Sequence, residues 1–228
     1  HSVGTVNDLL RLHEVPGIQH IDTRAITRLV RELGTVLCVF GPLGEEHRLR
    51  SVLEELTPPE LDDFVDRVSI DGVVELNPGS KDELGSSKPR LGVLDCGVKH
   101  NILRHLCMHF DVVWSPPDVT YDTLVNTYGI EALFCSNGPG DPAHPGKATD
   151  ARRTLARAVQ EGLPVMGICL GHQLMGLASG LKTYKMRYGH RGANQPVVDL
   201  VEGIVSITSQ NHGFAVSHPE DGCLAAHP

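Results

Sequence analysis

Between residues 91 and 179 the sequence alternates short apolar runs with longer stretches of helical periodicity, and this alternation narrows the choice of fold more than any other feature. The apolar runs predict strands at 91–95, 112–114, 132–135 and 164–168. The periodic stretches predict helices at 98–110, 147–161 and 170–179. Because strands that alternate with helices form βαβ units, we expect an α/β fold with an open, mostly parallel sheet and helices on both faces.

The pattern changes after residue 189. Three strand-like runs follow one another with no helix between them, at 196–200, 203–208 and 214–216. Consecutive strands with short connections favour antiparallel pairing. The sequence therefore predicts an antiparallel extension at the edge of the parallel sheet.

The chain before residue 90 has a different character. Residues 1–76 predict part of a smaller N-terminal domain, with one helix at 6–12 and a second that Asp22 caps and Gly34 ends. Residues 77–89 are polar and rich in turn-forming types, which is typical of a linker. The remaining residues, 90–228, form the predicted α/β domain.

Charge and composition exclude several classes of protein. A formal net charge of −8 disfavours a nucleic-acid binder, which needs a basic surface. No run of eighteen apolar residues is present, so we expect no membrane span. The six cysteines include no C-x-x-C pair, which favours free thiols in a reducing, cytoplasmic compartment. They stand at positions 38, 96, 107, 135, 169 and 223.

Cys169 is the cysteine whose surroundings indicate chemistry. It lies in residues 167–173, GICLGHQ, after an apolar strand and at the start of a helix, which is the arrangement of a nucleophile elbow. A β-carbon at Gly167 or Gly171 is expected to clash with the adjoining helix or strand. The partial positive charge of a helix N-terminus favours thiolate over thiol, and the N–H of Leu170 points toward the same place. The alternative is a buried cysteine in an ordinary β-to-α turn.

Two further segments follow predicted strands. Residues 136–142, SNGPGDP, carry Gly138 and Gly140, which let backbone amides approach a ligand, although a plain turn explains them equally well. Residues 208–216, TSQNHGFAV, carry Asn211 and Gly213, which are suited to an amide or an α-amino acid group. Taken alone, the second segment is better explained as a strand end with a polar turn.

Together these three segments, in this order between Leu91 and Val216, resemble the class I glutamine amidotransferases, which have a flavodoxin-like sheet. Two more segments resemble the small subunit of carbamoyl-phosphate synthase, or the matching domain of the fused enzymes. They are residues 183–196 and residues 15–27, the latter near the start of the chain. Without the resemblance, residues 183–196 predict only a charged loop that leads into a strand.

The resemblance implies a role for each matching residue. Cys169 attacks the side-chain amide of L-glutamine, and the amides of Leu170 and Gly140 hold the oxyanion. The residues that position the substrate are Gly138, Gln173, Asn211, Gly213 and Phe214. No cofactor or metal is implied for this chain. The implied partner is the large synthetase subunit or a fused domain, which uses ATP and Mg²⁺ to make carbamoyl phosphate for pyrimidine and arginine biosynthesis.

The sequence departs from the family at its triad. Family members complete the triad with a His-x-Glu pair several tens of residues after the segment that matches 211–214. His218 and Glu220 have the right spacing between them but stand too soon after Asn211, so we expect a solvated loop there. We therefore expect the chain to lack its C-terminal portion and the start of its N-terminal domain. His105 and His109, spaced i and i+4, have no evident third ligand, so a metal pair is the weaker interpretation.

Two other functions remain open. The first is a different class I amidotransferase, such as one that feeds GMP or anthranilate synthesis. The second is a scaffold that binds the synthetase without hydrolysing glutamine. Residues 185–196 and the N-terminal domain disfavour the first, and Cys169 disfavours the second.

Overall fold

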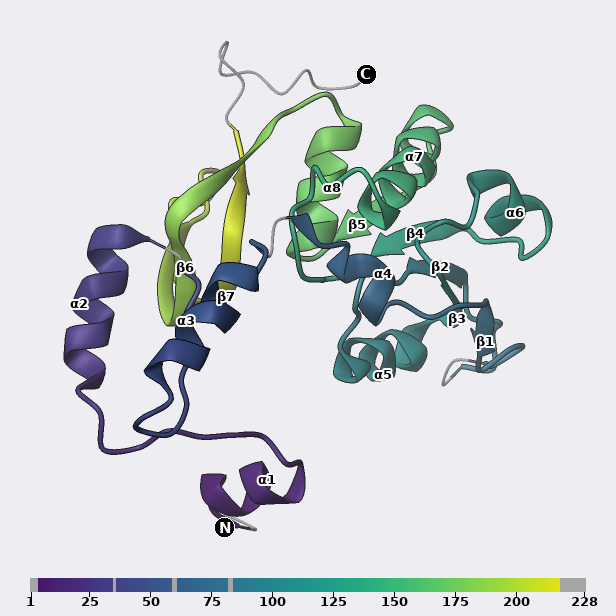
Figure 1. The fold of residues 1–228 in the computed structure, drawn as a ribbon. Helices are drawn as coiled ribbons and strands as arrows, with labels where there is room; N and C mark the ends of the chain where they lie inside the picture. The colour runs from purple at the N-terminus through teal and green to yellow at the C-terminus, as the bar shows by residue number, and fades with distance from the viewer. Residues whose placement is uncertain (1–3, 35, 59–60, 82–83, 218–228) are drawn as a thin grey trace. The chain divides into compact units, whose positions relative to one another are not determined.

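The computed structural model describes residues 4–34, 36–58, 61–81 and 84–217 (Figure 1). Its contacts divide the chain into two units, His1–Cys38 and Val39–Pro228. The first unit contains helices α1 (Val6–Leu12) and α2 (Thr23–Leu33), as the sequence predicted. Asp22 caps α2 by accepting the N–H of Ala25 at 2.9 Å, and Gly34 follows its last turn with a φ of 85°.

The second unit begins with elements that the sequence did not indicate. These are helices α3 (Glu46–Glu55) and α4 (Phe64–Val68) and strand β1 (Val74–Leu76). Strand β1 pairs antiparallel with a strand of the main sheet. In the segment predicted as a linker, the N–H groups of Gly79 and Ser80 donate to the carboxylate of Asp111 at 2.7 and 3.2 Å. The start of that segment is therefore fixed to the sheet.

The main sheet has the strand order β1-β3-β2-β4-β5. Its four parallel strands are β2 (Arg90–Leu94), β3 (Asp111–Ser115), β4 (Ala132–Cys135) and β5 (Val165–Gly167). Its helices are α5 (His100–His109), α6 (Tyr121–Asn126), α7 (Lys147–Gln160) and α8 (Leu170–Ala178). The predicted parallel sheet and three of these helices are confirmed, whereas α6 was not predicted.

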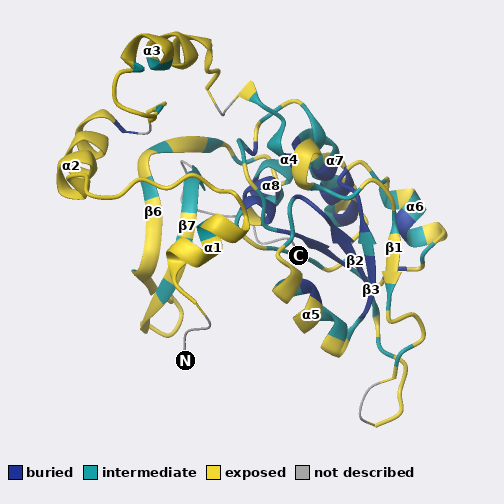
Figure 2. Cartoon of the chain, turned by 60° about the horizontal axis from the view of Figure 1, so that its bottom comes forward, coloured by how far each residue is buried: buried dark blue, intermediate teal, exposed yellow. Residues whose placement is uncertain are grey.

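Strands β2, β3 and β4 are buried on both faces, and successive residues of each strand point to opposite sides. Leu91, Val93 and Phe134 pack with Leu103 of α5 on one face. On the other face, strand residues that include Leu133 pack against α7 and α8. Figure 2 shows most of β2 and β3 in dark blue as buried, whereas β1 at the edge is mostly exposed. The carboxyl ends of the parallel strands therefore meet at one edge, where their loops form a common surface.

The predicted antiparallel extension of the main sheet is wrong. Strands β6 (Thr183–Val198) and β7 (Val205–Val216) pair with each other in a separate two-stranded sheet. The segment 183–196, interpreted as a charged loop, is most of β6. The register shifts between Lys185 and His190 and between Gly192 and Gln195, and these irregularities break the alternation that marks a strand in the sequence.

No helix in the described part of the chain combines the length and the apolar character that a membrane crossing requires.

Candidate active site

Cys169 stands on a strained turn between β5 and α8. Its φ of 54° and ψ of −108° lie outside the regions that residues with a side chain normally adopt. A β-carbon at Gly167 would stand 2.5 Å from the backbone of Gly171, and one at Gly171 would stand 2.6 Å from the carbonyl carbon of Cys135. The predicted need for glycine at both positions is confirmed. The surrounding backbone therefore holds Cys169 in a conformation that projects its thiol from the sheet edge.

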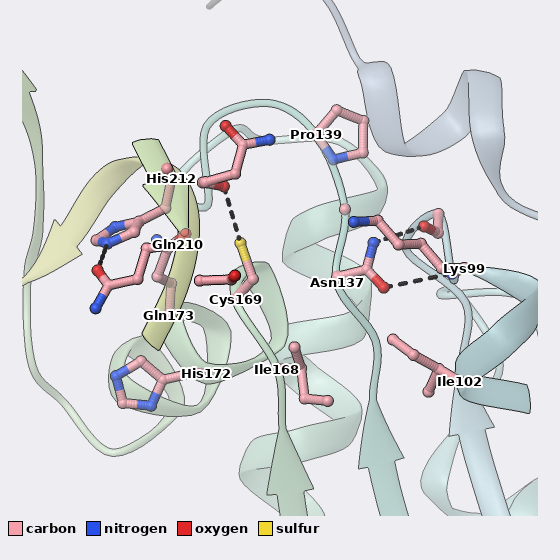
Figure 3. A pocket seen from close by; sticks show the side chains of 15 residues that line it. Lys99, Ile102, Asn137, Pro139, Ile168, Cys169, His172, Gln173, Gln210 and His212 are labelled. Carbon is pink, nitrogen blue, oxygen red and sulfur yellow. Dashed lines mark hydrogen bonds between the residues drawn. The ribbon is translucent and has the colours of Figure 1, made fainter. Parts of the chain in front are cut away.

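The thiol faces an open cavity of about 730 Å³. Figure 3 shows Cys169 between the loop that carries Asn137 and strand β7, which carries Gln210 and His212. The lining comes from the ends of β2, β4 and β5, the first turns of α5 and α8, and the two-stranded sheet. The lining residues are Gly97, Lys99, Ile102, Asn137, Gly138, Pro139, Ile168, Cys169, His172, Gln173, Gly192, Ser209, Gln210, Asn211 and His212.

Half of the residues that the sequence singled out line this cavity, namely Gly138, Cys169, Gln173 and Asn211. Gly140, Leu170, Gly213 and Phe214 lie beside the lining residues without lining the cavity themselves. The carbonyl oxygen of Phe214 accepts a hydrogen bond from Nε2 of Gln173 at 2.7 Å, which ties β7 to α8. Gly138 packs closely, since a β-carbon there would stand 2.7 Å from the side chain of Leu170.

The loop after β2 lines the cavity, although sequence reasoning gave it no role. Asp95 fixes this loop by accepting the N–H groups of Gly97 at 2.9 Å and Val98 at 2.8 Å. Asn137 bridges it to the loop after β4, because Nδ2 of Asn137 donates to the carbonyl oxygen of Gly97 at 3.0 Å. One feature of the sequence could have indicated that this loop lies at the site: residues 95–99 stand at the carboxyl end of a predicted strand. That position also brings Lys99 to the cavity, where none of the described lining residues is an Asp or a Glu.

The two-stranded sheet supplies the opposite wall. The thiol of Cys169 lies 3.8 Å from the carbonyl oxygen of Asn211, and Nη1 of Arg191 donates to Oδ1 of Asn211 at 2.7 Å. Nδ1 of His212 lies 2.8 Å from the carbonyl oxygen of Phe214, and its Nε2 lies 3.2 Å from Nδ1 of His190. These contacts hold the side chains of this wall in defined orientations.

A partner base for the thiol is not found in the described part of the chain. There, the hydrogen bond to Asn211 is the one contact of this kind that the thiol makes. His218 and Glu220 lie outside the described residues. The geometry therefore provides a nucleophile and a substrate-sized cavity, and leaves the proton acceptor unassigned.

The structure describes no group of three or more His, Cys, Asp or Glu side chains within residues 4–34, 36–58, 61–81 and 84–217 that could hold a metal ion. His105 and His109 both lie on α5.

The family model described as "Glutamine amidotransferase class-I" matches residues 92–227. The chain is 39% identical to the carbamoyl phosphate synthase small chain of Methanocaldococcus jannaschii, over 95% of this chain and 60% of that protein. It is also 39% identical to the protein of the same name from Methanopyrus kandleri, over 93% of this chain and 57% of that protein. The chain thus spans about 60% of the length of the curated relatives it matches.

A crystal structure of a glutamine amidotransferase from Methylobacillus flagellatus is similar to this chain, with a TM-score of 0.42 and 18% identity over 58% of each chain.

Proposed function

This chain belongs to the class I glutamine amidotransferase family, and we propose that its cavity binds L-glutamine and hydrolyses the side-chain amide through a thioester on Cys169. The observation that carries the proposal is the strained elbow, because it directs a thiol at a helix N-terminus into a substrate-sized cavity.

The proposed reaction has two halves. The sulfur of Cys169 attacks the amide carbon, and the carbonyl oxygen takes the negative charge of the tetrahedral intermediate. The carbon–nitrogen bond then breaks, and ammonia leaves with the proton that the thiol gave up. Water hydrolyses the resulting thioester, which releases glutamate and restores the thiol.

Two backbone N–H groups are proposed to stabilise the oxyanion, those of Leu170 and Gly140. In the described part of the chain neither N–H has a hydrogen-bond acceptor, so both remain available to a ligand. A donor of this kind acts on charge that develops only in the transition state. The side-chain Nε2 of Gln173 is engaged by Phe214, which leaves its Oε1 to accept from the ammonium group of an amino acid.

We further propose that the ammonia passes to a synthetase subunit or fused domain that makes carbamoyl phosphate with ATP and Mg²⁺, for pyrimidine or arginine biosynthesis. Support comes from the relatives at 39% identity, which are named carbamoyl phosphate synthase small chains, and from a Bacillus subtilis relative, 37% identical, named as the pyrimidine-specific small chain. The proposed location is cytoplasmic, because a reducing compartment keeps free thiols such as those of the described cysteines from forming disulfides.

The test uses the full-length protein. Glutamate release from glutamine is measured, and a glutamine-like chloroketone is added to label the nucleophile. Hydrolysis together with labelling of Cys169 that glutamine prevents is the expected result. Binding of glutamine with neither hydrolysis nor labelling would instead favour a scaffold.

A further inference from the structure

One carboxylate, that of Asp63, caps the N-termini of two helices. Oδ1 of Asp63 accepts the N–H of Asp66 in α4 at 3.1 Å, and Oδ2 accepts the N–H of Lys147 in α7 at 2.9 Å. Helix α7 has no cap of its own, because its N-cap residue is Gly146. A β-carbon at Gly146 would stand 2.6 Å from Cγ of Asp63. The start of α7 is therefore fixed by a residue 84 positions earlier in the chain.

Helix α4 also packs on both loops that form the sheet edge of the site. Its Phe64 side chain lies 3.6 Å from the β-carbon position of Gly140, and its Val68 side chain lies 2.8 Å from that of Gly97. Between them, Val65 is only 3% exposed and anchors the helix in the core. Just after the helix, the N–H of Ile70 donates at 3.1 Å to Asp95, the residue that fixes the loop carrying Gly97.

These contacts leave little freedom to the loop between β4 and α7. Its end at Lys147 is fixed by the carboxylate of Asp63, and Gly140 in its middle lies against Phe64. This loop carries the N–H of Gly140, whose value as an oxyanion donor depends on its position to within a fraction of an ångström. None of the described residues between 39 and 70 lines the cavity itself.

We propose that Asp63 is a positioning residue, which sets the loop carrying Gly138 and Gly140 by capping α4 and α7 together. The inference rests on the proposed function, since it assigns the loop a catalytic task. The segment 63–70 then belongs to the working site although it touches no substrate.

The test variant is Asp63→Asn, which has nearly the same shape. An amide offers one oxygen and one NH₂ group, so it can accept for one helix only and turns a donor toward the other N–H. The matched control is Asp22→Asn, because Asp22 caps α2 alone, through one oxygen. Both variants are made in the full-length protein.

The first measurement is amide hydrogen exchange, which requires no activity. We expect exchange at residues 138–147 to accelerate by roughly tenfold in Asp63→Asn, as loss of one charge-assisted hydrogen bond implies, and to be unchanged in Asp22→Asn. Unchanged exchange at 138–147 in Asp63→Asn would overturn the proposal.

The second measurement is kcat per chloroketone-labelled site. We expect kcat to fall by roughly tenfold or more while KM for glutamine stays within about twofold, because an oxyanion donor acts in the transition state. An unchanged kcat per labelled site would also overturn the proposal.

If the wild-type protein does not hydrolyse glutamine, the proposed function fails and the exchange measurement still decides the role of Asp63. If Asp63→Asn does not fold, Asp63→Ser, whose hydroxyl can cap α4 but leaves the N–H of Lys147 without an acceptor, gives the same two readings.

Discussion

Gly171 in α8 packs directly against the end of β4, where a β-carbon at position 171 would stand 2.6 Å from the carbonyl carbon of Cys135. The N–H of Gly171 also donates to the carbonyl oxygen of Ser136 at 3.0 Å. The first turn of α8 is thus tied to the strand that precedes the Gly138 loop. Cys169, two residues earlier, takes its position from this contact.

The substitution Gly171→Ala should therefore damage the site more than its size suggests. The new methyl group meets backbone rather than a flexible side chain, so α8 must move away from β4, at a cost of about 1–3 kcal/mol in the free energy of unfolding. We expect lower thermal stability together with a large loss of glutamine hydrolysis. Gly72→Ala is the control, because nothing lies within 4 Å of its β-carbon position. Equal behaviour of the two variants would show that the contact is unimportant.

The nucleophile gives the next prediction. In the full-length protein, Cys169→Ser should abolish glutamine hydrolysis and leave ammonia-dependent synthesis by the proposed complex intact, because the proposed synthetase would not use the thiol. The control is Cys38→Ser, since Cys38 is an exposed thiol outside the cavity. Hydrolysis at the wild-type rate in Cys169→Ser would refute the assignment.

Labelling should be selective for the same thiol. The hydrogen bond between Cys96 and Cys135, together with burial, raises the pKa of Cys96 well above its ordinary value, and burial raises the pKa of Cys107. Both thiols are therefore poor nucleophiles near neutral pH. Peptide mapping after treatment with a glutamine-like chloroketone should find the label on Cys169, and a label spread over several cysteines would contradict this.

How far the sequence predicts the fold depends on the kind of element. The buried parallel strands and their long helices were predicted because continuous apolar runs and helical periodicity are local signals. Most of strand β6 was not, because Gly189 and Gly192, with φ values of 69° and 130°, interrupt its alternation and its register depends on pairing with β7; only its end was predicted, as part of a strand at 196–200. Helix α4 has five residues, too few for periodicity to show, and packing of Val65 in the core stabilises it.

The site follows the same rule. The elbow was predicted from residues 167–173, with their two glycines, together with the apolar strand before them and the helix after them. Lys99 lines the cavity because it follows the end of β2, and Asp63 acts from outside the cavity through a contact with a segment 84 residues away; neither stands in a motif that indicates such a role. Sequence reasoning therefore finds residues whose local conformation is unusual, and misses residues that act by holding others.

Asp111 gives a prediction about pH. Burial raises the pKa of its carboxyl group, but hydrogen bonds from the hydroxyl of Ser80 and from the N–H groups of Gly79 and Ser80 outweigh burial, so the pKa lies below its ordinary value of 3.8. A lowered folded-state pKa stabilises the protein above the unfolded-state pKa, and this contribution is lost as the pH falls through the folded-state value.

Asp111→Asn should accordingly lower the free energy of unfolding at pH 7 by about 1–3 kcal/mol. The amide that replaces the carboxylate turns its NH₂ group, a donor, toward N–H groups that need an acceptor. The difference from wild type should shrink below about pH 3.8, where the wild-type carboxylate also begins to protonate in the unfolded state. Urea unfolding across this range provides the measurement. A difference that is constant with pH would show that the charge of Asp111 contributes nothing.

The last prediction concerns the synthetase partner. Ammonia is a poor product to release into water, because at neutral pH most of it protonates and ceases to be a nucleophile. Hydrolysis that feeds a synthesis should therefore be slow until the acceptor site is ready. The elbow provides a means of control, since a small shift of α8 or of the Gly138 loop would move the thiol relative to the oxyanion donors.

We expect steady-state glutamine hydrolysis by the full-length protein to rise when the proposed synthetase is present with ATP and bicarbonate. Cys169→Ser serves as the control, because it should still form the complex and show no hydrolysis under either condition. Equal turnover with and without the synthetase, and no complex in sedimentation at micromolar concentration, would favour a stand-alone amidase over the carbamoyl phosphate role.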